Sequence, residues 1–316
     1  MSVCIKKTIL LLLAFFFLIE VPAYSQTGAE EFFTHSPDFN KGRFATVMIS
    51  QAVVYTATML ILRKVWYKKY STGKFHLFND NREWLMMDKA GHFTTAYNMG
   101  RVSYGSLMWS GVNQRDAAWM GAGFAMLFLG TVEVFDGYSD GWGFSWGDMA
   151  ANTLGAGMLV GQDYLWQQQR ITAQFSYKKS IYADMNPDLL GTTRGERMLK
   201  DYNAQTYWLS FNVASFVPVG PDFPRWLDAS IGYGADGMIR AHKAEQLAMT
   251  DANVPKRFKQ FYLAPGLNWN MIQWNSPYPA TLMPLLNVYK VPFPSLEYNS
   301  LGKVKGHLIG WQTGIV

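Results

Sequence analysis

Two different patterns of hydrophobic positions divide this chain. Up to about residue 170, apolar residues form long runs that suit helices, and from about residue 171 onward they partly alternate with polar residues, as in β-strands. The pattern predicts an α+β protein in which a helical bundle, residues 26–170, is followed by an antiparallel, strand-rich region, residues 171–316.

The first region is expected to contain about four apolar helices, over residues 44–62, 92–109, 117–134 and 149–166. The first run carries no charge and approaches the ~20 residues that cross a bilayer. Arg101 interrupts the second run. Gly157 and Gly161 have the GxxxG spacing that lets helix backbones approach closely. A membrane-associated bundle and a buried, soluble bundle both fit this pattern.

The second region is expected to form strands over residues 175–183, 207–216, 226–239, 258–272 and 296–311. β-Branched and aromatic residues recur in these segments, and clusters of Pro and Gly separate them. A compact antiparallel sheet and a small antiparallel barrel are both compatible with this arrangement.

The N-terminus has the form of a secretory signal peptide over residues 1–25. Two lysines precede an apolar run over residues 9–19, and the small residues that end at Ser25 suit cleavage there. An uncleaved anchor helix is the alternative. The single cysteine, Cys4, precedes the apolar run, so neither an acylated N-terminal cysteine nor a thiolate ligand is expected in the mature chain.

The composition favours the cell envelope. Hydrophobic residues make up 49% of the chain and charged residues only 16%, whereas a soluble domain usually carries about 25% charged residues. We therefore expect an exported protein that is periplasmic or membrane-associated. The net charge of +5 is spread without a basic tract, so nucleic acid is not an expected partner, and membrane lipid or envelope glycan is.

Five polar residues stand in otherwise apolar, Gly-rich stretches of the helical region: Asp88, His92, Glu133, Asp148 and Asn152. An ionised carboxylate that is buried alone costs several kcal/mol, so these residues are expected to gather into one polar site between helices. We expect His92 to lie within reach of at least two of the other four.

The spacing of these residues allows both chemical and purely structural roles. Asp88 and His92 are four residues apart, so on a helix they share one face, where a carboxylate can orient an imidazole as a general base. The alternative is that Asp88 only caps the helix that His92 begins. Asp148 and Asn152 repeat this spacing, and Asp148 has an alternative role in a capping box with Ser145.

The same residues leave a metal site open. One imidazole and three carboxylates can bind a divalent cation, but the sequence has no HExxH motif, and no metal or cofactor is assigned. No P-loop, no GxGxxG motif that opens a helix after a strand, and no GxSxG elbow is present in the sequence.

These motifs carry a resemblance to known families. DKAGHF, followed by EVFDGYSDGWGFSWGD and AANTLGAG, resembles the YfiM-like family of predicted periplasmic lipoproteins, a domain of unknown function, and more distantly the VanZ-like membrane proteins. The shared positions are Asp88, Lys89, His92, Phe93, Glu133, Asp148, Asn152 and Gly155. The resemblance implies an envelope location. It implies no particular reaction, although the more distant family is linked to glycopeptide tolerance.

Two functions compete at this point. The leading one is a cell-envelope protein with a structural or binding role on lipid or glycan, built around the polar site. The alternative is a hydrolase or transferase that acts on lipid-linked or cell-wall substrates. In that case His92 is the general base, Asp88 orients it, and Glu133 or Asp148 is the acid or a metal ligand. An enzyme needs its polar groups to open into a cleft, whereas a structural network is closed.

Overall fold

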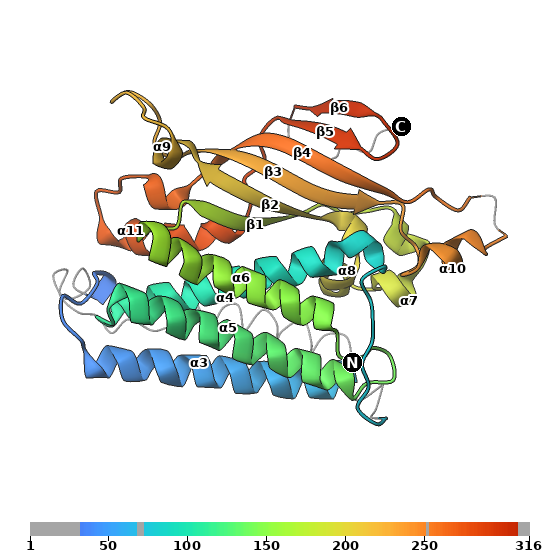
Figure 1. Cartoon of the computed structure of the whole chain (residues 1–316), viewed down its shortest axis with the longest axis horizontal. Helices are drawn as coiled ribbons and strands as arrows, with labels where there is room; N and C mark the ends of the chain where they lie inside the picture. The colour runs from blue at the N-terminus through green and yellow to red at the C-terminus, as the bar shows by residue number, and fades with distance from the viewer. Residues whose placement is uncertain (1–31, 68–72, 251–252, 309–316) are drawn as a thin grey trace.

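The computed structural model describes residues 32–67, 73–250 and 253–308. The expected signal peptide, residues 1–25, lies outside the described residues. A bundle of long helices lies on one side of the molecule and a curved sheet on the other, with helices and strands running along the long axis (Figure 1). The predicted α+β class, with a helical bundle before a strand-rich region, is confirmed.

The bundle consists of α3 (Lys41–Ile61), α4 (Met87–Trp109), α5 (Gln114–Gly137) and α6 (Trp146–Trp166). Each expected helix is present, but each begins earlier than its apolar run because a cap or a polar first turn precedes the run. The side chains of Asn40, Asn113 and Ser145 cap α3, α5 and α6 by accepting backbone N–H bonds.

The start of α4 differs from the sequence prediction. The helix begins at Met87 and its N-cap position is Met86, so Asp88 lies inside the first turn and is not the cap. The residues before it, Trp84, Leu85 and Met86, all have positive φ angles, of 44°, 52° and 69°. Their left-handed backbone turns the chain into α4 without a capping side chain.

Glycines set the distance between the bundle helices. A Cβ atom on Gly121 of α5 would lie 2.5 Å from the Gly100 carbonyl oxygen of α4, and one on Gly155 of α6 would lie 2.2 Å from the Phe93 carbonyl oxygen of α4. By contrast, Cβ atoms on Gly157 and Gly161 would meet no described atom within 4 Å. The close helix contact of α6 is therefore made at Gly155, not at the GxxxG pair.

The sheet is an antiparallel meander whose strand order follows the chain order. Its strands are β1 (Ile171–Tyr177), β2 (Gln205–Asn212), β3 (Leu227–Asp236), β4 (Phe258–Leu267), β5 (Ser295–Asn299) and β6 (Val304–His307). Short helices join them: α7 (Pro187–Leu190), α8 (Arg194–Lys200), α9 (Val213–Phe216), α10 (Lys243–Leu247) and α11 (Pro277–Leu282).

Several strand boundaries predicted from the sequence are wrong. The strand expected over residues 175–183 ends at Tyr177, and residues 213–216 of the next form a helical turn. The single strand expected over residues 296–311 is instead the β5–β6 hairpin, which turns at residues 300–303. Gly302 has a φ of 80° in this turn, a conformation that glycine adopts without strain.

The sheet packs on the bundle through α4 and α6. Ala173 of β1 is fully buried against Tyr97 of α4 and Leu159 of α6, and α3 lies on the far side of the bundle (Figure 1). Arg101, which interrupts the second apolar run, is buried and donates from Nη1 to the carbonyl oxygen of Pro284, 2.9 Å away. This charged residue therefore joins the bundle to the C-terminal region.

Candidate functional site

Three helices bring four of the five predicted residues together, with Glu133, Asp148 and Asn152 around His92. His92 lies on α4, Glu133 on α5, and both Asp148 and Asn152 on α6. His92 Nδ1 is 3.1 Å from Asn152 Oδ1 and 3.7 Å from Glu133 Oε1, and His92 Nε2 is 3.7 Å from Asp148 Oδ1. The residues thus form one polar cluster, and its catalytic or binding role stays a prediction.

The fifth residue, Asp88, belongs to an adjoining network. Its Oδ2 atom lies 2.9 Å from Lys89 Nζ, which also lies 2.8 Å from Asp148 Oδ1 and 2.5 Å from Asp80 Oδ1. In the described part of the chain the partner of the Asp88 carboxylate is Lys89, and the group that orients His92 is Asn152. Asp148 lies between the two networks and joins them.

Two contributors to this network, Lys89 and Asp80, are not among the five predicted site residues, although Lys89 is one of the positions shared with the resembling families. Lys89 stands within DKAGHF, and its position beside Asp88 was a signal that a buried cation accompanies the carboxylates. Asp80 lies in a connecting segment, where no periodic pattern could place it. Together with Ser145, which donates from Oγ to Asp80 Oδ1 over 2.6 Å, they hold the carboxylates of Asp80, Asp88 and Asp148 in place.

Ser145 connects the cluster to the start of α6. Its Oγ accepts the backbone N–H of Asp148 at 3.1 Å, and its own backbone N–H donates to Glu133 Oε2 at 3.3 Å. In a capping box that second bond would go to the side chain three residues later, here Asp148. Because Glu133 takes it instead, the Asp148 carboxylate remains available to Lys89 and His92.

Burial dominates the electrostatics of the cluster. The side chains of Glu133 and Asp148 are 1% and 8% exposed, and that of His92 is 23% exposed. Burial, assisted by Asp148, raises the pKa of Glu133 to about 9, and burial raises the pKa of Asp148 to about 8. Burial lowers the pKa of His92 to about 4. At neutral pH the imidazole is therefore neutral.

Lys89 behaves in the opposite way. Burial alone would lower its pKa, but the neighbouring Asp88 and Asp148 carboxylates raise it above its ordinary value. Lys89 therefore stays charged and supplies a fixed positive charge to three carboxylates.

Two sets of groups have metal-ligand spacing, each with its ligand atoms within 4.8 Å of one another: Asp80, Asp88 and Asp148, and His92, Glu133 and Asp148. Lys89 contacts every member of the first set.

Some polar atoms of the cluster lack a partner. Among the described residues, no hydrogen bond reaches Glu133 Oε1, Asp88 Oδ1 or Asn152 Nδ2, although each of these atoms is buried. A buried polar atom without a partner costs about 1–3 kcal/mol. A closed structural network would satisfy such atoms, so this arrangement favours a bound species at the cluster.

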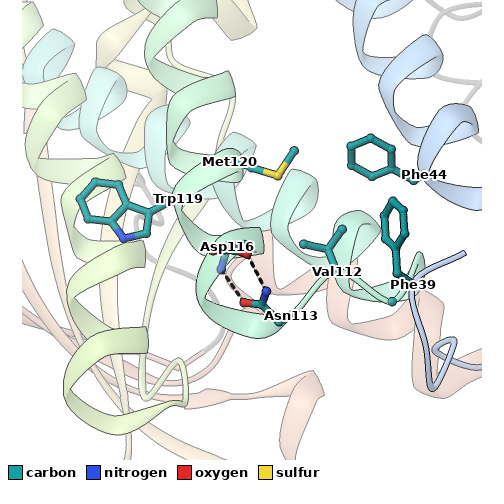
Figure 2. A pocket seen from close by; sticks show the side chains of 8 residues that line it. Phe39, Phe44, Val112, Asn113, Asp116, Trp119 and Met120 are labelled. Atoms are coloured by element: carbon teal, nitrogen blue, oxygen red, sulfur yellow. Dashed lines mark hydrogen bonds between the residues drawn. The ribbon is translucent and has the colours of Figure 1, made fainter. Parts of the chain in front are cut away.

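A hollow on the surface lies elsewhere, between the start of α3 and the start of α5. Figure 2 shows it lined mainly by apolar side chains, with Asn113 and Asp116 hydrogen-bonded to each other. The remaining lining residues are Phe39, Phe44, Gly111, Val112, Trp119 and Met120. None of the five predicted site residues lines it, so it is not the cleft that an active site there would need.

The fold and the cluster define an α+β protein with a polar centre inside its helical bundle. Residues 76–161 match the family described as "Predicted periplasmic lipoprotein (DUF2279)", and this segment contains all five predicted site residues. No curated protein and no solved structure matches the chain. The protein is thus an exported, envelope-associated protein, as the composition predicts.

Proposed function

We propose that this cell-envelope protein contacts membrane lipid through two apolar surfaces, one on its sheet and one on α3, with the polar cluster enclosed in the bundle. The observation that carries this proposal is the arrangement of side chains on the sheet. On β3–β6 most large exposed side chains are apolar and most polar side chains point inward, which is the reverse of the arrangement that water favours.

The outward side of the sheet has rows of exposed apolar residues. The register aligns Ile231, Leu263 and Leu296 across β3, β4 and β5, and these side chains are 50%, 57% and 51% exposed. A second row, Phe261, Tyr298 and Val304, is similarly exposed. We call these six residues the apolar sheet face. The first row continues through Leu209 to Ala173, where the bundle covers it.

The opposite side of the sheet is buried, and its side chains are mostly polar beside a small apolar cluster of Trp208, Tyr262 and Ala264. His307 Nε2 lies 2.9 Å from Glu297 Oε2, and both residues are nearly inaccessible. Ser210 Oγ and Ser230 Oγ are 2.7 Å apart, and Lys290 Nζ donates to Ser230 Oγ over the same distance. Polar side chains that pair inside and apolar side chains that face outward are characteristic of sheets whose surroundings are lipid.

Helix α3 offers a second apolar surface. Within Lys41–Lys64, a stretch of 18 residues has a mean hydropathy of 1.7, and only 11% of that stretch is buried in the protein. Large side chains on it, including Ile49, Val53 and Leu60, are more than half exposed. Gln114–Gly137 is also long and apolar enough to cross a membrane, but it is more buried, at 39%. By length and composition alone, such helices remain weak support.

Lipid fits these surfaces better than glycan does. A sugar ring is bound by flat aromatic side chains with polar groups beside them, whereas the first row of the apolar sheet face is aliphatic. An aliphatic surface of this kind is suited to acyl chains, whose burial is favourable by about 25 cal/mol per Å².

Membrane fractionation tests this proposal. Cells that make the full chain are lysed, and their membranes are washed with high salt and then with detergent. We expect the wild type to resist salt and dissolve in detergent. The triple variant Ile231→Gln, Leu263→Gln, Leu296→Gln should move towards the salt-soluble fraction. Leu199→Gln, which changes an exposed leucine of α8, is the control and should stay with the membranes. Release of the wild type by salt alone would contradict the proposal.

A second candidate function is a hydrolase or transferase acting on lipid-linked or cell-wall substrates. The observation in its favour is that His92 is the most accessible member of the cluster, and its imidazole is held in one tautomer. Because Asn152 Oδ1 can only accept a hydrogen bond, Nδ1 carries the proton, and Nε2 is the basic atom.

This candidate predicts a separation between folding and activity. In cells that lack the protein, His92→Gln should accumulate to the wild-type level but leave the lipid and cell-wall composition as in the deletion, measured by mass spectrometry. His242→Gln is the control, because His242 pairs with Glu83 outside the cluster. Restoration of the wild-type composition by His92→Gln would exclude His92 as a catalytic base.

A further inference from the structure

We propose that His92, Glu133 and Asp148 are the protein ligands of a single divalent metal ion, of the class of Zn²⁺ or Mn²⁺, held between α4, α5 and α6. This site is independent of the proposed lipid contact, because all three residues lie inside the bundle.

The separations of the candidate ligand atoms fit one ion. One nitrogen of His92 and one carboxylate oxygen from each acid all lie within 4.8 Å of one another. Zinc lies about 2.0–2.2 Å from nitrogen and oxygen ligands, so two ligands of one ion are usually about 3–4 Å apart. The 3.7 Å between His92 Nε2 and Asp148 Oδ1 lies within that range.

The imidazole is already oriented as a ligand. Its Nδ1 donates to Asn152 Oδ1, which leaves the lone pair of Nε2 on the side of Asp148. Metal-binding histidines nearly always donate their second ring N–H to such a partner, which fixes the tautomer and the ring plane. Asn152 is therefore a positioning residue for His92.

Glu133 presents one fixed and one unpartnered oxygen. Oε2 accepts the backbone N–H of Ser145, while no hydrogen bond among the described residues reaches Oε1. Oε1 lies 3.7 Å from Nδ1 of the His92 ring, and one ligand atom from each of His92, Glu133 and Asp148 lies within 4.8 Å of the other two. The residue is only 1% exposed. A metal ion would occupy the position that this buried oxygen leaves without a partner.

Asp148 can serve both the ion and Lys89. Its Oδ1 lies 2.8 Å from Lys89 Nζ and 3.7 Å from His92 Nε2, and a carboxylate oxygen has two lone pairs. Lys89 is the cation that faces Asp80, Asp88 and Asp148, so the carboxylates outnumber it when Glu133 is included. A divalent ion beside Glu133 would displace the proton of that carboxyl group and offset the negative charge that its loss leaves.

The donor set indicates the kind of ion. One imidazole and two carboxylates, without sulfur, suit Zn²⁺ or Mn²⁺, whereas Mg²⁺ and Ca²⁺ favour oxygen alone. The partial exposure of His92 leaves one side of the ion open to water or to a substrate oxygen.

Metal binding to the purified full chain tests the proposal. The protein in detergent is stripped with a chelator and dialysed against Zn²⁺ or Mn²⁺, and bound metal is measured by mass spectrometry. We expect about one ion per wild-type chain and at least a roughly tenfold weaker affinity in Glu133→Gln and in His92→Gln. Glu83→Gln is the matched control, because Glu83 forms a carboxylate–histidine pair with His242 to which the described residues add no third ligand. It should bind like the wild type.

X-ray absorption of the Zn²⁺-loaded wild type adds a reading that needs no variant. We expect a shell of nitrogen and oxygen with one imidazole. Three results would overturn the site: no retained ion in the wild type, equal affinity in a folded Glu133→Gln variant, or a shell without imidazole. If Glu133→Gln does not fold, the wild-type stoichiometry and spectrum decide. Membrane partition plays no part in these measurements, so their failure is separate from failure of the lipid proposal.

Discussion

The backbone N–H of Ser145 donates to Glu133 Oε2 over 3.3 Å. A carboxyl group of α5 therefore accepts the hydrogen bond of the N-cap residue of α6. This bond links the capping of one helix to the buried acid of its neighbour. It also explains why Asp148, at the position where a capping box would use it, instead faces Lys89 and His92.

Ser145 should contribute measurably to stability. Ser145→Ala removes both the acceptor for the Asp148 N–H and the donor to Asp80. We expect a loss of about 1–2 kcal/mol in the free energy of unfolding, measured by chemical denaturation in detergent. Ser145→Thr keeps the hydroxyl and should stay close to the wild type. An unchanged Ser145→Ala would mean that water replaces both bonds.

Two glycines of α6 should respond oppositely to the same substitution. Gly155→Ala places a Cβ atom 2.2 Å from the Phe93 carbonyl oxygen, so α4 and α6 must separate, at about 1–3 kcal/mol. Gly157→Ala meets no described atom within 4 Å and should be neutral or stabilising by up to about 1 kcal/mol, because alanine favours a helix. Thermal unfolding of both variants checks this. Equal effects would contradict the packing of α4 on α6.

The buried Lys290 should make stability depend on alkaline pH. Burial, opposed by Asp228, lowers its pKa to about 8 from 10.5. Between these values the unfolded chain binds the proton and the folded chain releases it, so stability from this group rises with pH through that window. As the pH rises from about 8 to 10.5, the free energy of unfolding of the wild type should increase by on the order of 3 kcal/mol relative to that of Lys290→Met. The free energy of unfolding between pH 7 and 11 measures it.

An exposed lysine provides the control for that measurement. Lys303→Met should reproduce the wild-type pH profile, because Lys303 lies in the exposed turn between β5 and β6. A wild type and a Lys290→Met variant with parallel profiles would show that the ammonium at Lys290 is hydrated and not confined between Ser230 and the Pro265 carbonyl oxygen.

The sequence predicted the helices better than the sheet for a physical reason. An apolar run of about twenty residues defines a helix wherever its neighbours lie, but alternation along a strand does not tell which face is buried. Ile231 and Ser230 follow that alternation, yet Ser230 is the buried one. The hairpin at residues 300–303 was missed because the aromatic and aliphatic residues on both sides of its turn read as one segment.

Within the cluster, the predicted gathering of residues followed from the cost of burying each carboxylate alone. The cost of burial indicates which residues need partners, but it does not indicate which partner each of them has. Spacing placed Asp88 beside His92, one turn away on the same helix, but it could not place Asn152, which reaches His92 from α6. The position of Asp80 depends on contacts between distant segments, which no local spacing encodes.

The left-handed turn at Trp84–Met86 makes the start of α4, and with it the cluster, depend on contacts with the C-terminal region. A left-handed backbone costs about 1–2 kcal/mol for each residue other than glycine, so these residues will not adopt it alone. Bonds from the C-terminal region hold it: the Tyr233 hydroxyl of β3 donates to the Leu85 carbonyl oxygen, and the Trp84 N–H donates to the Ala241 carbonyl oxygen. The entry to α4, which carries Lys89 and His92, is therefore stabilised by β3 and by the segment that follows it.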